Sequence, residues 1–213
     1  MSRKSRILEA IDTHKYLRRW MIEQAFFRIP SGKRRSQILL KQMVEEKHLK
    51  RFRMGPREEY IYYQGKRSEK WRHWLLLNGF HFSLLSDLKS WQKVLYWRHE
   101  YKYPYGIADG LYVVRTTLES GIKFFLEVDD GQNDFDKVGR YEAYMMSRKW
   151  EGESWADPLN RGVKTFPMLV VATKREIPKS DTIKIITIER QERYKDLLRS
   201  IHHGKGNELT QRG

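Results

Sequence analysis

The sequence predicts an α+β protein with two parts: a basic helical part that ends in a hairpin, followed by a part built on a mixed sheet. Three observations support this prediction. Apolar residues recur at helical spacing within residues 5–48, and strand-like alternation follows at 50–64. Residues 94–172 then show the order strand, strand, strand, helix, strand. Because a helical crossover joins parallel strands, the sheet is expected to be mixed.

Charge is concentrated at the N-terminus. The chain has 213 residues and a net charge of +15, with a pI of about 9.9. Residues 1–70 hold 19 Lys and Arg against 8 Asp and Glu, a net of +11, whereas residues 71–213 have a net of only +4. A large one-sided excess indicates a polyanionic partner: DNA, RNA or an anionic membrane. The N-terminal third is the part expected to bind it.

Several protein classes are excluded by composition. The sequence has no cysteine, which excludes cysteine-ligated zinc, iron–sulfur clusters, thiol nucleophiles and disulfides. No N-terminal apolar stretch is typical of a signal peptide. The longest apolar runs, such as 168–172, are the size of strands, and a membrane-spanning helix needs about 20 residues. We expect a cytoplasmic protein with no membrane partner.

Two helices are expected within residues 5–28. Their apolar faces consist of residues at helical spacing: Ile7, Leu8 and Ile11, then Leu17, Trp20 and Met21. Thr13 is expected to cap the second helix. Pro30 and Gly32 break the pattern, and Ser31 is expected to be the N-cap of a third helix.

The third helix is expected from about Lys33 to His48 and has two distinct faces. Its core face consists of apolar residues, Leu39, Leu40, Met43 and Val44. Arg34, Gln37 and Lys41 share another face, at spacings of three and four, and no acid follows Arg34 until Glu45. Arg and Gln can hydrogen-bond base edges and Lys can reach phosphates, so this face is typical of a recognition helix.

A hairpin of KRFRM (50–54) and YIYYQ (60–64), joined by GPREE (55–59), is expected next. Helices followed by a basic two-stranded ribbon predict a winged helix-turn-helix that binds double-stranded DNA. The alternative is a basic helical domain that binds a protein partner. The DNA contacts are expected from basic and amide side chains of the third helix and hairpin: Lys33, Arg34, Arg35, Gln37, Lys41, Arg53 and Arg57.

The polar segment GKRSEK (65–70) suggests a linker. We therefore predict a DNA-binding domain at 1–66, a second domain at 67–201 and a flexible tail at 202–213. A helix is expected at 71–90, with a potential interruption at Asn78-Gly79. Residues 181–201 are ambiguous, because 182–188 resembles a strand and 192–201 a helix.

The strands LYVVRT and IKFFLEV carry acids at one end. If they form a hairpin about Leu118 or Glu119, paired residue numbers sum to about 236–238. Asp109 then lies beside Glu127 or Asp129, and those two share a face because strand periodicity is two. Three carboxylates are thus expected at one edge of the sheet.

Crowded carboxylates repel unless a cation neutralises them. Mg²⁺, or Mn²⁺ in its place, takes one or two carboxylates together with water and substrate phosphate, which suggests metal-assisted phosphodiester cleavage. The alternative is an acidic turn in which Asn133 or Asp134 caps the next helix. Asp109 and Glu127 favour the metal site, because each ends an apolar strand where an acid has no structural purpose.

The motif IADG, followed after 16 residues by EVDDG, resembles the core of the PD-(D/E)XK nuclease superfamily. Over residues 5–175 the chain resembles the replication-relaxation family of plasmid and phage proteins. The matching features are the helix-turn-helix with its wing, the HWLLLNGF helix, the strand before IADG, FFLEVDDG, and Lys137 with Tyr141 in the following helix. The resemblance implies a restriction-endonuclease-like α/β domain and a role in plasmid or phage replication.

By this resemblance Asp109 and Glu127 would be metal ligands and Glu100 the upstream acid. The chain departs from the motif at Asp129, which stands where the motif has its lysine; that lysine stabilises charge in the transition state. The expected catalytic set is Asp109, Glu127, Asp129 and Lys137. Lys137 is the first candidate to replace the missing lysine, since it shares a helix face with Tyr141, and Gln132 is the second.

Two functions are compatible with these features. The first is a DNA endonuclease or nickase that depends on Mg²⁺ or Mn²⁺. The second is a non-catalytic DNA-binding regulator with a degenerate nuclease-like domain. A rolling-circle relaxase is excluded, because it needs two histidines spaced by two and no pair has that spacing. A homodimer is compatible with either function, since winged-helix proteins often bind palindromic DNA.

Overall fold

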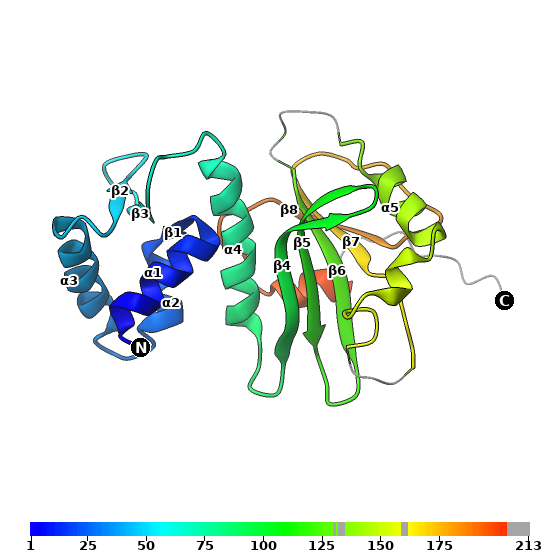
Figure 1. Ribbon diagram of the computed structural model, residues 1–213, viewed down its shortest axis with the longest axis horizontal. Coiled ribbons are helices and arrows are strands. Elements are labelled where there is room, and N and C mark those ends of the chain that lie inside the picture. The colour runs from blue at the N-terminus through cyan, green and yellow to red at the C-terminus, as the bar shows by residue number, and fades with distance from the viewer. Residues whose placement is uncertain (130, 132–134, 159–161, 204–213) are drawn as a thin grey trace. The chain divides into compact units, whose positions relative to one another are not determined.

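The computed structural model describes residues 1–129, 131, 135–158 and 162–203 (Figure 1). Within these residues the protein is α+β, with six α-helices and a mixed five-stranded sheet, so the predicted class is confirmed. The chain divides into two compact units, Met1–Ser86 and Asp87–Gly213.

The first unit combines four helices with a small antiparallel sheet (Figure 1). Its elements are α1 (Arg3–His14), β1 (Tyr16–Arg18), α2 (Arg19–Phe26), α3 (Gly32–Glu45), β2 (Lys50–Phe52), β3 (Ile61–Tyr63) and α4 (Trp71–Asp87, ending at the unit boundary). The strand order is β1-β3-β2. The predicted hairpin is confirmed, since Lys50 pairs with Tyr63 and Phe52 with Ile61.

The core of this unit is formed where α1, α2 and α3 meet. The predicted core face of α3 is confirmed, because Leu40 and Met43 are fully buried in that cluster and Leu39 and Val44 pack against it. The turn between α2 and α3 depends on Gly32. A Cβ atom there would lie 2.0 Å from the carbonyl oxygen of Phe27, so a side chain would force the two helices apart.

The strand β1 was not predicted. Lys15 adopts a left-handed backbone with φ of 63°, which ends α1 and turns the chain into three buried residues that pair with β3. The predicted cap at Thr13 is wrong. Its hydroxyl donates to the carbonyl oxygen of Glu9 at 3.0 Å, and the residue at the N-cap position of α2 is Arg18.

The boundary between the units lies at the end of α4, between Ser86 and Asp87, whereas the sequence suggested 66/67. The helix α4 runs through Asn78 and Gly79 without interruption. The amide of Asn78 donates to the carbonyl oxygens of His14 (2.7 Å) and Tyr16 (2.8 Å). Because these are buried hydrogen bonds to the α1–β1 connection, α4 completes the first unit.

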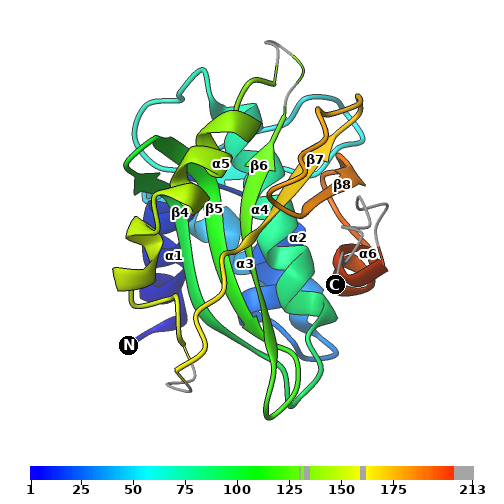
Figure 2. The ribbon, with the colours of Figure 1, turned by 90° about the vertical axis from the view of Figure 1, so that its right-hand side faces the viewer.

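The second unit is built on one sheet with the strand order β4-β5-β6-β7-β8. Its elements are β4 (Lys93–Tyr103), β5 (Gly106–Arg115), β6 (Gly121–Val128), α5 (Val138–Met146), the 3₁₀ helix η1 (Lys149–Gly152), β7 (Met168–Thr173), β8 (Ile185–Glu189) and α6 (Leu197–His203). The pairs β4–β5 and β5–β6 are antiparallel, whereas β6–β7 and β7–β8 are parallel. The crossover through α5 therefore joins a parallel pair, as predicted, and Figure 2 shows α5 lying across the sheet.

The predicted register of the β5–β6 hairpin is confirmed. Gly110 pairs with Leu126 and Leu111 with Phe125, so paired numbers sum to 236. The ambiguous C-terminal segment contains both β8 and α6. The helix predicted between the third and fourth strands of residues 94–172 is α5, which covers Val138–Met146. Residues 132–134 and most of the expected tail, 204–213, lie outside the described residues.

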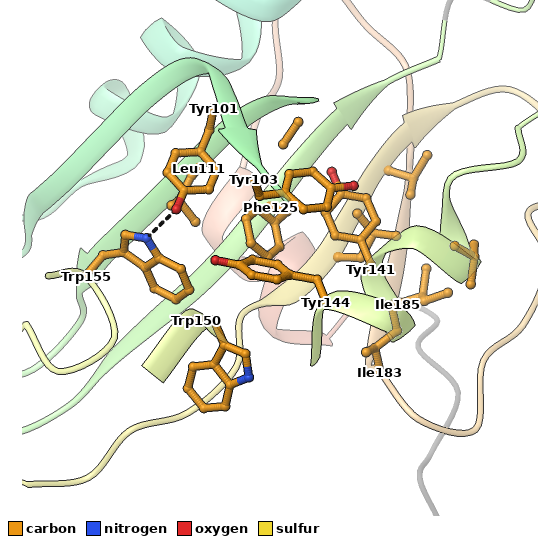
Figure 3. Close-up of a cluster of buried hydrophobic side chains, with 14 of the residues drawn as sticks. Tyr101, Tyr103, Leu111, Phe125, Tyr141, Tyr144, Trp150, Trp155, Ile183 and Ile185 are labelled. Atoms are coloured by element: carbon orange, nitrogen blue, oxygen red, sulfur yellow. Dashed lines mark hydrogen bonds between the residues drawn. The ribbon is translucent and has the colours of Figure 1, made fainter. Parts of the chain in front are cut away.

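An aromatic cluster fixes α5 against the sheet (Figure 3). The ring of Tyr141 stacks on Tyr103 with centroids 5.2 Å apart, and Phe125 lies 5.0 Å from the same ring. Burying one large apolar side chain stabilises a fold by about 1.5–3 kcal/mol. The cluster therefore determines which residues at the start of α5 face the end of β6.

Candidate functional site

Glu127 is a buried acid near the end of β6. Its residue is 1% exposed, yet its neighbours in the strand are apolar. The ammonium group of Lys137 donates to Oε2 at 2.5 Å, and the hydroxyl of Tyr141 donates to Oε1. Both donors come from the start of α5, so the aromatic packing that positions α5 also positions them.

Asp109 lies beside this group on β5. Its Oδ2 accepts the backbone N–H of Val128 at 2.7 Å, so the hydrogen-bonded edge of the hairpin brings Asp109 next to the residue that follows Glu127. The two carboxylates are close enough for the charge on Asp109 to raise the pKa of Glu127. The prediction that Asp109 lies beside Glu127 is thus confirmed.

Opposing effects set the ionisation of this pair. Burial raises the pKa of Glu127 to about 8 and Asp109 adds to the rise, while the contacts with Lys137 and Tyr141 oppose it. Burial alone would lower the pKa of Lys137, but the carboxylates of Glu127 and Asp109 outweigh it and the net direction is upward. Lys137 is therefore held as an ammonium ion against two acids.

Asp129 has a different environment from the one expected. Arg175 donates to both of its oxygens, from Nε at 2.9 Å and from a terminal nitrogen at 2.7 Å, and Thr173 donates to it at 2.5 Å. Burial alone would raise the pKa of Asp129, but these contacts outweigh it and lower the pKa. Asp129 thus has a structural partner at the end of β7, and two carboxylates rather than three form the site.

The donor set at Asp109 and Glu127 fits a magnesium or manganese ion bound by one or two carboxylates, with water or phosphate as further ligands. Within the described residues, no group of three or more His, Asp or Glu side chains is arranged to hold a metal. Lys137 occupies one oxygen of Glu127, so a cation and this ammonium group would share the same carboxylate.

The remaining site candidates are placed as follows. Glu100 is exposed on β4, where its backbone has φ of 49°, an uncommon conformation for a residue other than glycine. Its exposure contrasts with the burial of Glu127. Gln132 lies outside the described residues. The hydroxyl of Tyr141, which the sequence singled out only through its spacing from Lys137, is a direct partner of Glu127.

The exposed face of α3 is basic. The side chains expected to contact DNA from this helix are all exposed: Lys33, Arg34, Arg35, Gln37 and Lys41. Lys41 lies 3.7 Å from Glu45, in an exposed pair of the kind that contributes little to stability. In the described part of the chain, no side-chain hydrogen bond or ion pair engages Arg34, Arg35 or Gln37.

The turn between β2 and β3 carries two exposed arginines, Arg53 and Arg57. Arg53 donates to the carbonyl oxygen of Pro56 at 2.9 Å. The two acids of this turn are paired elsewhere: Glu58 lies 3.7 Å from Arg18, and Glu59 accepts from Arg19 at 3.0 Å. The basic charge of the turn is therefore left largely uncompensated.

Arg51 is a basic residue of the hairpin that sequence reasoning did not select. It is exposed on β2, and its guanidinium group lies over the ring of Tyr60 at 4.2 Å from the centroid. Such stacking orders a long side chain. Alternation along KRFRM could have identified it, because a strand there would place Arg51 and Arg53 on the same side, and both guanidinium groups lie over the ring of Tyr60.

Among the described residues, none of the helices has the length and apolarity that a membrane crossing requires. Comparison with known proteins finds no matching family model, no matching curated protein and no matching solved structure.

Proposed function

We propose that this protein binds double-stranded DNA through its first unit and cleaves or nicks DNA at a divalent-metal site formed by Asp109 and Glu127 in its second unit. The observation that carries this proposal is the contact of Lys137 with Glu127 at 2.5 Å. It provides an ammonium group beside the acid pair, which is what the motif lysine would otherwise supply.

The DNA-binding half of the proposal rests on element order and charge. The element order supports a winged helix-turn-helix: a helix, a strand, two helices and a hairpin, with the strand order β1-β3-β2. In that arrangement the helix after the turn enters the major groove, and here that helix is α3. Its exposed Arg34, Gln37 and Lys41 suit base and phosphate contacts.

The catalytic half rests on the division of roles in the second unit. Asp109 and Glu127 would hold a Mg²⁺ or Mn²⁺ ion, which when bound supplies Lewis-acid polarisation of the scissile phosphate. The ammonium group of Lys137 can donate to a phosphate oxygen and stabilise developing negative charge. Tyr141 orients the Glu127 carboxylate through its hydroxyl. Antiparallel strands followed by a helical crossover to a parallel strand support a restriction-endonuclease-like domain.

A second candidate is a non-catalytic DNA-binding regulator, and a specific observation favours it. Lys137 and Tyr141 both occupy the Glu127 carboxylate, and burial raises the pKa of Glu127 to about 8. A glutamate neutralised in this way is a poorer metal ligand. Under this alternative the contact of Lys137 with Glu127 has only a structural role, in a degenerate domain. For either function, the resemblance to the replication-relaxation family supports a role in plasmid or phage replication.

Nicking of supercoiled plasmid separates the two candidates. One nick per molecule relaxes the plasmid visibly on a gel, so the assay is sensitive. The nuclease proposal predicts relaxation by the wild-type protein with Mg²⁺ or Mn²⁺, none in EDTA, and none with Asp109→Asn or Glu127→Gln. Lys137→Met should slow cleavage and retain metal binding. A homodimer, if formed on palindromic DNA, would cut both strands.

The matched control is Asp136→Asn, which removes an exposed acid that pairs with Arg140 across one turn. It should cleave like the wild type. Relaxation that persists in Asp109→Asn would contradict the proposed site. A wild-type protein that leaves plasmids carrying its own binding site supercoiled in both metals would favour the regulator.

A further inference from the structure

The exposed face of α3 contains one apolar side chain that the sequence pattern did not single out. Ile38 is 60% exposed, although the helix buries Ser36, Leu40 and Met43 on its opposite side. Residues three and four apart are neighbours on a helix surface. Arg34 and Lys41 are therefore next to Ile38 along the helix, and Ile38 lies near the centre of the exposed face.

The surroundings of Ile38 are cationic and polar. Lys33, Arg34, Arg35, Gln37, Lys41 and Gln42 are all exposed on the same helix, and Glu45 at its end is the first acid. Isolated exposed apolar residues are common on protein surfaces. Ile38 differs from these because it lies among the exposed side chains that would bind a polyanion, so DNA bound by them would cover it as well.

We propose that Ile38 contacts the 5-methyl group of a thymine in the major groove. This inference rests on the DNA-binding role proposed for α3. Among the four bases, thymine alone presents an apolar group in the major groove, and apolar side chains recognise it there. Arg34 and Gln37, which precede Ile38 on the helix, would hydrogen-bond to neighbouring base edges. The bound sequence therefore contains a preferred thymine beside positions read by hydrogen bonds.

The size of the effect follows from the group that is buried. Burial of one methyl-sized group stabilises a complex by an amount that corresponds to roughly a fourfold change in affinity. Replacement of thymine by deoxyuridine removes only that methyl group and keeps base pairing. The substitution therefore isolates the proposed contact from charge and hydrogen bonding.

The test uses the full-length protein and a duplex selected by it from random-sequence DNA. Each thymine of the selected site is replaced in turn by deoxyuridine, and the Kd is measured at constant salt. At one thymine per half-site the wild-type protein should lose roughly fourfold in affinity. Ile38→Ala should bind the parent duplex more weakly and show no further loss with deoxyuridine there. Ile38→Val should retain part of the sensitivity.

Leu118→Ala is the matched control, because Leu118 is an exposed apolar residue in the other unit (77% exposed). It should keep the full deoxyuridine sensitivity. Salt-dependent binding that is insensitive to deoxyuridine at every thymine would overturn the inference and leave DNA binding intact. Sensitivity that persists in Ile38→Ala would also overturn it. Absence of salt-dependent DNA binding would overturn the proposed function together with the inference.

Discussion

The ammonium group of Lys137 lies 2.5 Å from the Glu127 carboxylate and ties the start of α5 to the end of β6. Glu127 is buried, whereas the Lys137 side chain is 31% exposed. A charge buried without a partner is costly, so this contact contributes to stability whether or not the site is catalytic. Activity and stability must therefore be measured together in any variant of either residue.

Lys137→Ala should lower the free energy of unfolding by about 1–3 kcal/mol, because it leaves a buried carboxylate without its cation. The loss should be much smaller in a Glu127→Gln background, where no charge remains to be compensated. Urea unfolding of the four proteins in this cycle measures the coupling. Arg140→Ala, which breaks the exposed pair with Asp136, should change stability by less than about 0.5 kcal/mol. Equal losses in both backgrounds would contradict the ion pair.

Gly32→Ala should destabilise the first unit by about 1–3 kcal/mol, since its methyl group would clash with the Phe27 carbonyl oxygen. DNA affinity should fall with it, because α3 would shift relative to α2. Gly139→Ala is the matched control. Nothing lies within 4 Å of a Cβ at Gly139 in α5, so alanine should stabilise by about 0.5–1 kcal/mol. Thermal unfolding of both variants tests this, and a harmless Gly32→Ala would contradict the close approach of Gly32 to the Phe27 carbonyl group.

Binding to DNA should weaken steeply with salt. For about 5–8 phosphate contacts, the log–log slope of affinity against salt concentration should be about −5 to −7. Lys41→Ala and Arg57→Ala should each make the slope less steep by about one, and each should weaken binding to all DNA sequences alike. Arg34→Ala and Gln37→Ala should instead cost about 1–3 kcal/mol at one base pair and relax preference there. If Arg34→Ala weakens binding to all DNA sequences equally, Arg34 contacts a phosphate group and does not read a base.

The first unit should lose stability in acid because of His14. Burial lowers the pKa of His14 to about 4, although a hydrogen bond with Asn78 opposes the shift. The unfolded chain, with an ordinary histidine pKa, then binds the proton more tightly than the folded one. The contribution of His14 is therefore complete above about pH 6.5 and lost as the pH falls towards 4, by about 3 kcal/mol in all.

Denaturant unfolding between pH 7 and 4 measures this loss. As the pH decreases, the free energy of unfolding should fall less steeply in His14→Gln than in the wild type. The reason is that the variant takes up about one proton fewer on unfolding over that interval. Parallel curves for the two proteins would show that His14 is not buried in its neutral form.

The sequence allowed the β5–β6 register to be predicted, because alternation and a short loop leave few pairings. Glu127 was therefore placed beside Asp109 correctly. The predicted role of Asp129 could not take Arg175 into account, since that partner lies 46 residues away at the end of the adjacent parallel strand. Contacts between chain segments far apart in sequence do not follow from local patterns.

Two errors in the first unit have a similar origin. The strand β1 has only three residues, too few for alternation to be recognised, and it exists because β3 pairs with it. The polar segment 65–70 suggested a domain boundary, but the buried amide of Asn78 joins α4 to the α1–β1 connection. Composition indicates where a linker can occur, whereas buried hydrogen bonds decide which unit a helix completes.

A crystal of the protein soaked with Mn²⁺ tests the central claim most directly, since the anomalous signal locates the ion independently of activity. The proposed site should give one strong peak between Asp109 and Glu127, with Lys137 displaced from the oxygen that it now contacts. The peak should be absent in Asp109→Asn. A site without anomalous density, with Lys137 still paired to Glu127 at high Mn²⁺ concentration, would contradict a metal site at Asp109 and Glu127.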